Sequence, residues 1–316
     1  DPNVVDPVVF YDNEGKLWMI YGSYSGGIFV KEMDAETGMP LESGYGEKLL
    51  GGNHLRIEAP YVIYNEETGY YYMFLSFGGL DSDGGYNIRV CRSENPNGPY
   101  VDSMGQDMKD CKGPAGSAFS DATAELYGTK LMGGYKFTWK EGEEGEDRKG
   151  YLSPGHNSCL YQEETGKYFI IYHTRFENSG ETHEVRVHQM FFNEEGWPVI
   201  VPYRYTEESA EKLESKQLVG TYKYINHGRD ISPDMKESEE LILNKNNTLS
   251  GALEGTWELS GDYNITLKTD EAEYKGIALK QWDEDGKKYV MTFTALDSKS
   301  GTAIWGSGLN ALNAIE

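Results

Sequence analysis

The sequence predicts an all-β protein in which propeller-like hairpin modules are followed by a small β-barrel or sandwich. Three observations lead to this prediction. The 316 residues include 38 Gly and 24 Tyr, and 13% are aromatic, a composition that favours strands and tight turns. A hairpin pattern recurs along the first two thirds of the chain. The last hundred residues are short apolar stretches separated by NN, GD and DG turns, which are hairpin signals.

The recurring hairpins come first in the chain. Each has a short apolar strand, an acidic turn that closes on glycine, and an aromatic-rich strand; they span residues 8–23, 62–77 and 159–174, with turns at Gly15, Gly69 and Gly166. Glycine suits a turn position that requires positive φ. The interval of 54 residues from Gly15 to Gly69 suits one four-stranded propeller blade. The longer interval to Gly166 suits a blade with an insertion, residues 100–150, whose acidic run 141–147 we expect as a solvated loop.

The composition divides the chain into three parts. Residues 1–205 form the predicted propeller part, and its last blade-like piece is 183–204 with a turn at Gly196. Residues 206–217, TEESAEKLESKQ, are predicted as a helical or linker stretch. Residues 218–316 form the second β region, which shows no Asp/Glu/His constellation and is therefore interpreted as a structural or substrate-flanking module.

Charge and hydropathy exclude several classes of partner. The formal net charge of −23 makes the chain a poor match for nucleic acid or an anionic membrane surface. It has no apolar run of about 18 residues, as a transmembrane helix would need, and its first residues do not resemble a signal peptide. Cys91, Cys111 and Cys159 are read as three buried thiols, with one disulfide plus a free thiol as the alternative.

Polar residues stand just before the repeated hairpins at equivalent positions. They are Asp6 in NVVDPVVF, Glu58 in RIEAPYVI and His156 in SPGHNSCL. In a propeller the innermost strand of each blade lines the central channel, so these three side chains are expected at one rim. Two carboxylates beside a histidine suggest acid/base hydrolysis of the kind glycosidases use. The alternative is that both carboxylates lie on solvated strand ends.

Other residues could complete such a site. His156 could be a metal ligand or proton donor, or a turn histidine bonded to the backbone; alone it would suit a hard cation held mostly by oxygen. His54, His183 and His188 could line the same rim. Aromatic rings that could stack on sugars, or instead fill cores, are those of Tyr24, Phe77 and Trp139.

Together the motifs NVVDPVVFYDNEGKLWMIYGSYSGGI, RIEAPYV, NIRVCRSENPNGPY, PGHNS, IIYHTRF and VRVHQMFFNEEGWPVI resemble family-43 glycoside hydrolases. The likeness covers nearly all of residues 1–205 and is strongest to endo-1,5-α-L-arabinanases with an appended C-terminal β domain. It implies a five-bladed β-propeller that cleaves α-1,5-linked arabinan, or arabino-oligosaccharides, with inversion. It also implies export, to the extracellular space or the periplasm, because arabinan is a large plant cell-wall polymer.

The resemblance assigns roles to individual residues. Glu58 in IEAP resembles the general acid, and Asp6 in the DP motif resembles the aspartate that tunes and orients it. His156 in GHNS resembles the channel histidine associated with a central metal ion, usually calcium. Residues that resemble the sugar-binding loop or adjoin it are Ser23, Tyr24, Ser25, Gly26, Ser76 and Phe77.

The sequence departs from the family pattern before Asp6. The family's general-base aspartate precedes the tuning aspartate, whereas only five residues precede Asp6 here, and three blade-like units are visible rather than five. We therefore expect the base on a preceding segment or on a second polypeptide that carries the first blades. A third explanation makes Asp6 itself the base. The alternative functions are a non-catalytic carbohydrate-binding propeller, or exo-arabinosidase or β-xylosidase activity.

Overall fold

The computed structural model describes residues 1–140, 143 and 149–312 and confirms the all-β prediction. Most of the acidic run 141–147 lies outside the described residues. Glu143 is the exception, and it is not solvated: its side chain is 6% exposed and its carboxylate pairs with Lys223 at 2.8 Å and Lys288 at 3.3 Å.

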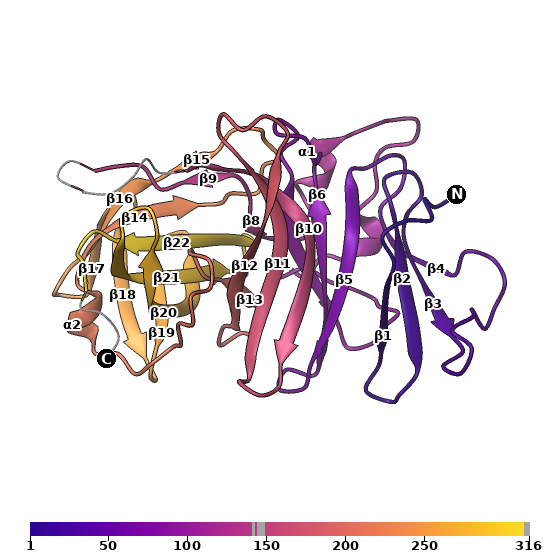
Figure 1. Cartoon of the computed structure of the whole chain (residues 1–316), viewed down its shortest axis with the longest axis horizontal. Coiled ribbons are helices and arrows are strands. Elements are labelled where there is room, and N and C mark those ends of the chain that lie inside the picture. Colours follow the sequence, from indigo (N-terminus) through magenta and orange to yellow (C-terminus); the bar gives the residue numbers. More distant parts are fainter. Residues whose placement is uncertain (141–142, 144–148, 313–316) are drawn as a thin grey trace.

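The chain begins with a four-stranded antiparallel sheet at one end of the elongated molecule (Figure 1). Its strands follow chain order: β1 (Val8–Tyr11), β2 (Leu17–Ser23), β3 (Gly27–Met33) and β4 (Glu47–Leu50). The turn between β1 and β2 closes on Gly15, whose φ of 83° is the conformation for which glycine was expected. The first predicted hairpin is therefore present.

The next two groups repeat this antiparallel arrangement. One contains β5 (Ile57–Asn65), β6 (Tyr70–Phe77), β7 (Asn87–Ser93) and β8 (Thr129–Met132); the other contains β10 (Tyr151–Gln162), β11 (Lys167–Phe176), β12 (His183–Phe192) and β13 (Pro198–Ile200). The β7–β8 connection carries a 3-10 turn at Met108–Asp110 and the short helix α1 (Asp121–Ala124). Three blade-like groups are thus present in the described chain, and a total of five blades stays a prediction.

The C-terminal strands close into a barrel. Its strands are β14 (Gly220–Asn226), β16 (Glu239–Leu243), β17 (Thr248–Gly251), β18 (Gly255–Ser260), β19 (Asn264–Lys268), β20 (Glu273–Asp283), β21 (Lys288–Asp297) and β22 (Thr302–Gly308). Pairing of β14 with β22 joins the two ends of this series. Side chains such as Trp257, Phe293 and Leu241 fill the interior. Of the predicted helical or linker stretch, only its end is helical, in α2 (Ser215–Leu218).

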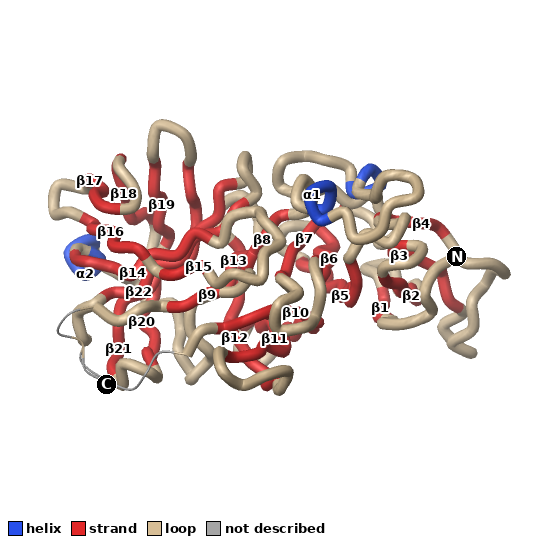
Figure 2. Tube along the Cα trace, turned by 90° about the horizontal axis from the view of Figure 1, so that it is seen from above, coloured by secondary structure: helices blue, strands red, loops and turns tan. Residues whose placement is uncertain are grey.

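The barrel packs directly against the blade-like sheets, and Figure 2 shows the two parts side by side along the long axis. The short strand β15 (Lys236–Glu237) pairs with β9 (Tyr135–Lys136), and β22 meets β8 at Thr302 and Lys130. One hydrophobic core includes Ile88 and Tyr172 from the sheets and Trp305 from the barrel. The two parts therefore share a core.

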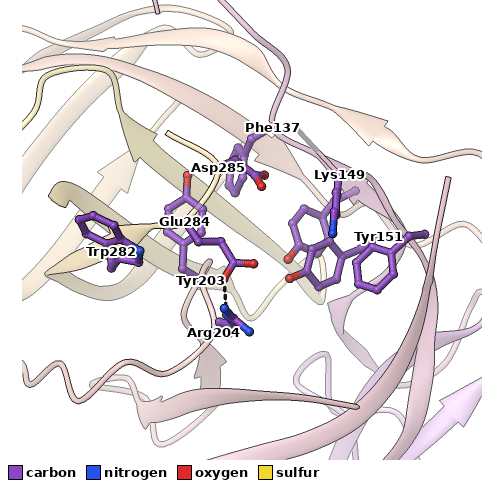
Figure 3. A pocket seen from close by; sticks show the side chains of 10 residues that line it. Phe137, Lys149, Tyr151, Tyr203, Arg204, Trp282, Glu284 and Asp285 are labelled. Atoms are coloured by element: carbon purple, nitrogen blue, oxygen red, sulfur yellow. Dashed lines mark ion pairs between the residues drawn. The ribbon is translucent and has the colours of Figure 1, made fainter. Parts of the chain in front are cut away.

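A small aromatic cavity lies at this junction (Figure 3). Its lining includes Tyr151, Tyr203 and Trp282, and an ion pair joins Arg204 to Glu284. Its volume is about 20 Å³, which is room for about one water molecule. This cavity is therefore too small for a sugar ring.

Two further sequence expectations can be compared with the fold. Cys91, Cys111 and Cys159 are free and buried, which confirms the reading as three thiols. Within the described chain, no helix combines the length and apolar character that a membrane crossing requires.

Candidate functional site

The structure brings Asp6 close to His156 and to the neighbour of Glu58. Glu58 is the second residue of β5 and His156 lies in the first half of β10, and the two strands begin at the same end of the sheets (Figure 1). The regular ladders are interrupted here. The β5–β6 register shifts between Glu58 and Tyr61, and the β10–β11 register shifts on both sides of Gly155. Such bulges redirect side chains, and they concentrate next to functional sites.

The backbone is strained at the same three places. Asp6, Ala59 and His156 have φ values of 53°, 52° and 47°, a left-handed conformation that non-glycine residues adopt rarely. Each such residue costs about 1–3 kcal/mol and persists only where the surrounding structure enforces it. The local fold therefore supports a specific orientation of these residues at the expense of backbone stability.

Both carboxylate oxygens of Glu58 accept hydrogen bonds from buried hydroxyls. Ser23 Oγ, at the end of β2, donates to Oε2 at 2.9 Å, and Tyr86 OH donates to Oε1 at 2.6 Å. Tyr86 is completely buried, and burial followed by the nearby Glu58 charge raises its pKa well above the usual value. Tyr86 therefore remains a proton-bearing donor while Glu58 keeps partial contact with solvent.

Gly155 makes room for that tyrosine. A Cβ atom at Gly155 would lie 2.1 Å from Tyr86 Cδ1, much closer than non-bonded atoms approach. The glycine of the PGHNS motif therefore allows the Tyr86 ring to pack beneath the site and to reach Glu58.

Asp6 is connected to both of the other predicted residues. Its Oδ2 accepts a hydrogen bond of 3.2 Å from the backbone N–H of Ala59, the neighbour of Glu58. Its Oδ1 lies 3.8 Å from His156 Nε2. Asp6 thus links the start of β5 to β10 and can fix the backbone that carries Glu58.

His156 belongs to a row of stacked rings. Its backbone N–H donates to Ser76 Oγ at 2.7 Å, and its imidazole lies 6.2 Å from that of His173. His173 in turn stacks on Tyr86 at 5.9 Å and contacts the exposed His183 at 4.9 Å. Burial, and then the charges of His183, Arg175 and His156, lower the pKa of His173 to about 4. His173 is therefore neutral near pH 7.

The predicted sugar-binding loop is only partly accessible. Tyr24, Ser25 and Gly26 are half-buried, and Tyr24 OH donates to the Gly78 carbonyl at 2.8 Å. Gly26 packs against the first two residues, because an added Cβ would lie 2.5 Å from the Asp1 carbonyl oxygen. Ser23 is 4% exposed and contacts Glu58 instead.

Several sequence expectations need correction. Ser76 and Phe77 are fully buried, so neither offers a surface to a ligand. Ser76 Oγ accepts the hydrogen bond from the His156 backbone, and the Phe77 ring packs against the Arg89 guanidinium, 4.8 Å away. His188 is likewise buried, between Tyr172 and Val201, and does not line the rim. Trp139 lines a separate pocket of about 370 Å³ with Phe176 and Glu184.

The described residues do not by themselves fit a calcium ion. Calcium takes six to eight oxygen ligands. Across the described parts of the chain there is no group of three or more His, Cys, Asp and Glu side chains that could hold a metal. His156 offers nitrogen, and Asp6 already accepts from Ala59. Calcium at His156 stays a prediction.

Sequence reasoning missed Tyr86 and His173. Tyr86 lies immediately before β7 and His173 lies within β11, and neither stands before a predicted hairpin. Gly155 belongs to the PGHNS motif. It leaves room for Tyr86 through contacts between β10 and the residue before β7, and the sequence does not reveal those contacts.

Comparisons with known proteins identify the family of the chain. Residues 1–130 match the family model described as glycosyl hydrolases family 43, and residues 202–306 match the model of a C-terminal lipocalin-like domain. Extracellular endo-α-(1→5)-L-arabinanase 2 of Bacillus subtilis is 54% identical over 307 residues, 97% of this chain and 64% of that protein. The extracellular endo-α-(1→5)-L-arabinanase of Thermotoga petrophila is 50% identical over 311 residues, 96% of this chain and 64% of that protein.

The fold is shared with solved structures. A glycoside hydrolase family 43 protein, YxiA, from Bacillus licheniformis superposes with a TM-score of 0.93 at 53% identity, covering 98% of this chain and 68% of that one. The chain spans 64% of the length of the two curated relatives above. Sequence, fold and both domain models point to the same family, and the chain belongs to glycoside hydrolase family 43.

Proposed function

We propose that this chain provides the general acid and the surrounding cleft of an inverting endo-1,5-α-L-arabinanase. The observation that carries the proposal is the Glu58 carboxyl group, held by Ser23 and Tyr86 at the rim where Asp6 and His156 meet. Relatives at 50% and 54% identity are named arabinanases, which supports arabinan as the substrate. Their description as extracellular supports an exported protein.

In the proposed reaction Glu58 donates a proton to the leaving glycosidic oxygen as the bond to the arabinose ring breaks. The hydroxyls of Ser23 and Tyr86 hold its carboxyl group in one orientation, and Asp6 holds the backbone beside it through Ala59. Inversion also requires a base that activates water, about 6.5–9.5 Å from the acid. Because Asp6 is assigned to orienting the acid, we propose that polypeptide outside this sequence supplies the base.

Glu58→Gln tests the acid in the intact protein. General acid catalysis contributes about 10²–10⁴-fold, so hydrolysis of linear arabinan should fall by that factor, measured as reducing ends released. Glu66→Gln is the matched control, because Glu66 is an exposed glutamate in the turn at the other end of β5, and it should leave the rate unchanged. A Glu58→Gln rate within a few fold of the parent would remove Glu58 from the acid role.

The products of the parent protein test the rest of the proposal. Internal cleavage should give a ladder of oligosaccharides at early times. Arabinose as the sole early product would favour exo-action. Binding of arabinan by the intact protein without any product would favour the carbohydrate-binding alternative.

A further inference from the structure

The rim beside Glu58 carries an aromatic side chain that the site described above does not use. Phe119, in the long β7–β8 connection, is 56% exposed, although it is a large apolar residue. It immediately precedes the Ser120 cap of α1, which lies at the same end of the sheets as the starts of β5 and β10 (Figure 1). An exposed aromatic ring at the edge of a proposed sugar cleft calls for a physical explanation.

The ring is held in place by residues next to the acid. The Arg56 guanidinium lies over it at 5.8 Å, and the Tyr24 ring meets it edge-on at 6.1 Å with an interplanar angle of 76°. Arg56 stands two residues before Glu58, and Tyr24 follows the Ser23 that bonds Glu58. The supports of Phe119 are therefore continuous in sequence with the catalytic rim.

Its backbone is also fixed. Phe119 has a φ of 56°, and its N–H donates to the His54 carbonyl at 3.1 Å. Earlier in the same connection, the Gly113 carbonyl accepts a hydrogen bond of 2.7 Å from Asn53 Nδ2. A loop that is tied down at two places loses little conformational entropy when a ligand binds, which favours affinity.

The guanidinium beside the ring belongs to a partly exposed ion pair. Arg56 Nε donates to Asp121 Oδ1 at 3.0 Å, and the Arg56 and Asp121 side chains remain 21% and 27% exposed. An arabinose ring has apolar C–H faces and a rim of hydroxyls. The Phe119 ring suits the C–H face, and the Arg56 donor and the Asp121 acceptor suit the hydroxyls. A purely apolar ligand would remove the ion pair from water without offering it hydrogen bonds.

We propose that Phe119, Arg56 and Asp121 form a distal sugar subsite, the Phe119 platform, which binds an arabinose unit remote from the scissile bond. Phe119 stacks on the C–H face, and Arg56 and Asp121 bond the hydroxyls. The platform rests on the proposed function for the identity of the sugar. Phe119 contacts Arg56 and Tyr24, whereas Glu58 is held by Ser23 and Tyr86. The platform is therefore assigned to a sugar unit other than the two that share the scissile bond, and it should act on long chains and not on the shortest ones.

Titration calorimetry of the intact protein tests the platform. The Glu58→Gln background prevents turnover, and the ligands are α-1,5-linked arabinohexaose and arabinobiose. Phe119→Ala should weaken hexaose binding about five- to tenfold, the scale of one aromatic contact, and should change biose binding less than twofold. Phe119→Tyr should restore hexaose binding. Tyr161→Ala is the control, because Tyr161 is 44% exposed and lies at the opposite end of β10.

The platform is overturned if Phe119→Ala leaves hexaose affinity unchanged, if it weakens hexaose and biose equally, or if the parent does not bind hexaose. The failure of the proposed function looks different. Hexaose binding that depends on Phe119, in a native protein that releases no product, would refute the hydrolase and keep the platform. Arabinan hydrolysis that depends on Glu58 but not on Phe119 would refute the platform and keep the hydrolase.

Discussion

At the scale of single residues, the orientation of Glu58 depends on the absence of a side chain at another position. Tyr86 reaches Glu58 Oε1 only because Gly155 has no Cβ. The sequence indicated Glu58, Asp6 and His156 from their equal places before three hairpins, and those three residues do meet. It could not indicate Tyr86, because the contact joins β10 to the residue before β7, two places that neither adjoin in sequence nor share a pattern.

Two substitutions distinguish the room that Gly155 leaves for the Tyr86 ring from the hydrogen bond that Tyr86 donates to Glu58: Gly155→Ala and Tyr86→Phe. Tyr86→Phe removes one donor to a carboxyl group, worth about 1.5–3 kcal/mol, and should lower kcat on arabinan about 10- to 100-fold with little change in fold. Gly155→Ala should lower kcat similarly and also cost about 1–3 kcal/mol of unfolding free energy from overpacking. Urea unfolding and arabinan hydrolysis measure the two effects. A Gly155→Ala protein with parental activity would mean that Tyr86 does not need its present position.

At the scale of elements, hairpins were predictable and their irregularities were not. An acidic turn ending in glycine between two apolar strands indicates β1–β2, β5–β6 and β10–β11 directly. The bulges at Glu58 and Gly155 follow from how β5 and β10 pack on other strands, and no local pattern marks them. The same limit explains Phe77: its sequence neighbours suggested a ligand loop, whereas β6 turns it into the core.

The sheet of β10–β12 should lose stability in acid. His173 and His188 have folded-state pKa values of about 4, below their ordinary value of 6.5, chiefly because of burial. The folded chain therefore binds these protons less readily than the unfolded chain. The stability that they contribute is complete above pH 6.5 and is lost as the pH falls toward 4. For the fully buried His188 the loss approaches about 3 kcal/mol.

Unfolding free energies measured in urea between pH 7 and pH 4 test this expectation. His173→Phe keeps a ring against Tyr86 but cannot bind a proton, so the slope of stability against pH should become shallower. Equal slopes for the parent and His173→Phe would show that His173 binds protons alike in the folded and unfolded chains.

At the scale of the whole molecule, the barrel strands are apolar on two faces. In β22, Ile304 points into the barrel core, whereas Ala303 and Trp305 point into the core shared with the sheets. In β20, Ala278 lies in the barrel core, whereas its neighbours Ile277 and Leu279 lie in the core shared with the sheets. Runs such as GIAL and TAIWG are apolar at consecutive positions because both faces are buried. The sequence predicted only a small barrel or sandwich, and it could not say that the second face meets β8, β9 and β12.

This shared core predicts that the sheets and the barrel unfold together. Trp305 is fully buried, and its ring lies 4.3 Å from His227, 4.9 Å from Tyr135 and 6.4 Å from His188, so it contacts both parts of the molecule. Trp305→Ala should cost about 3–5 kcal/mol and lower one common transition in calorimetry, with equal calorimetric and van't Hoff enthalpies. Two separate transitions, of which only one moves with Trp305→Ala, would mean that the barrel folds independently of the sheets that carry Glu58.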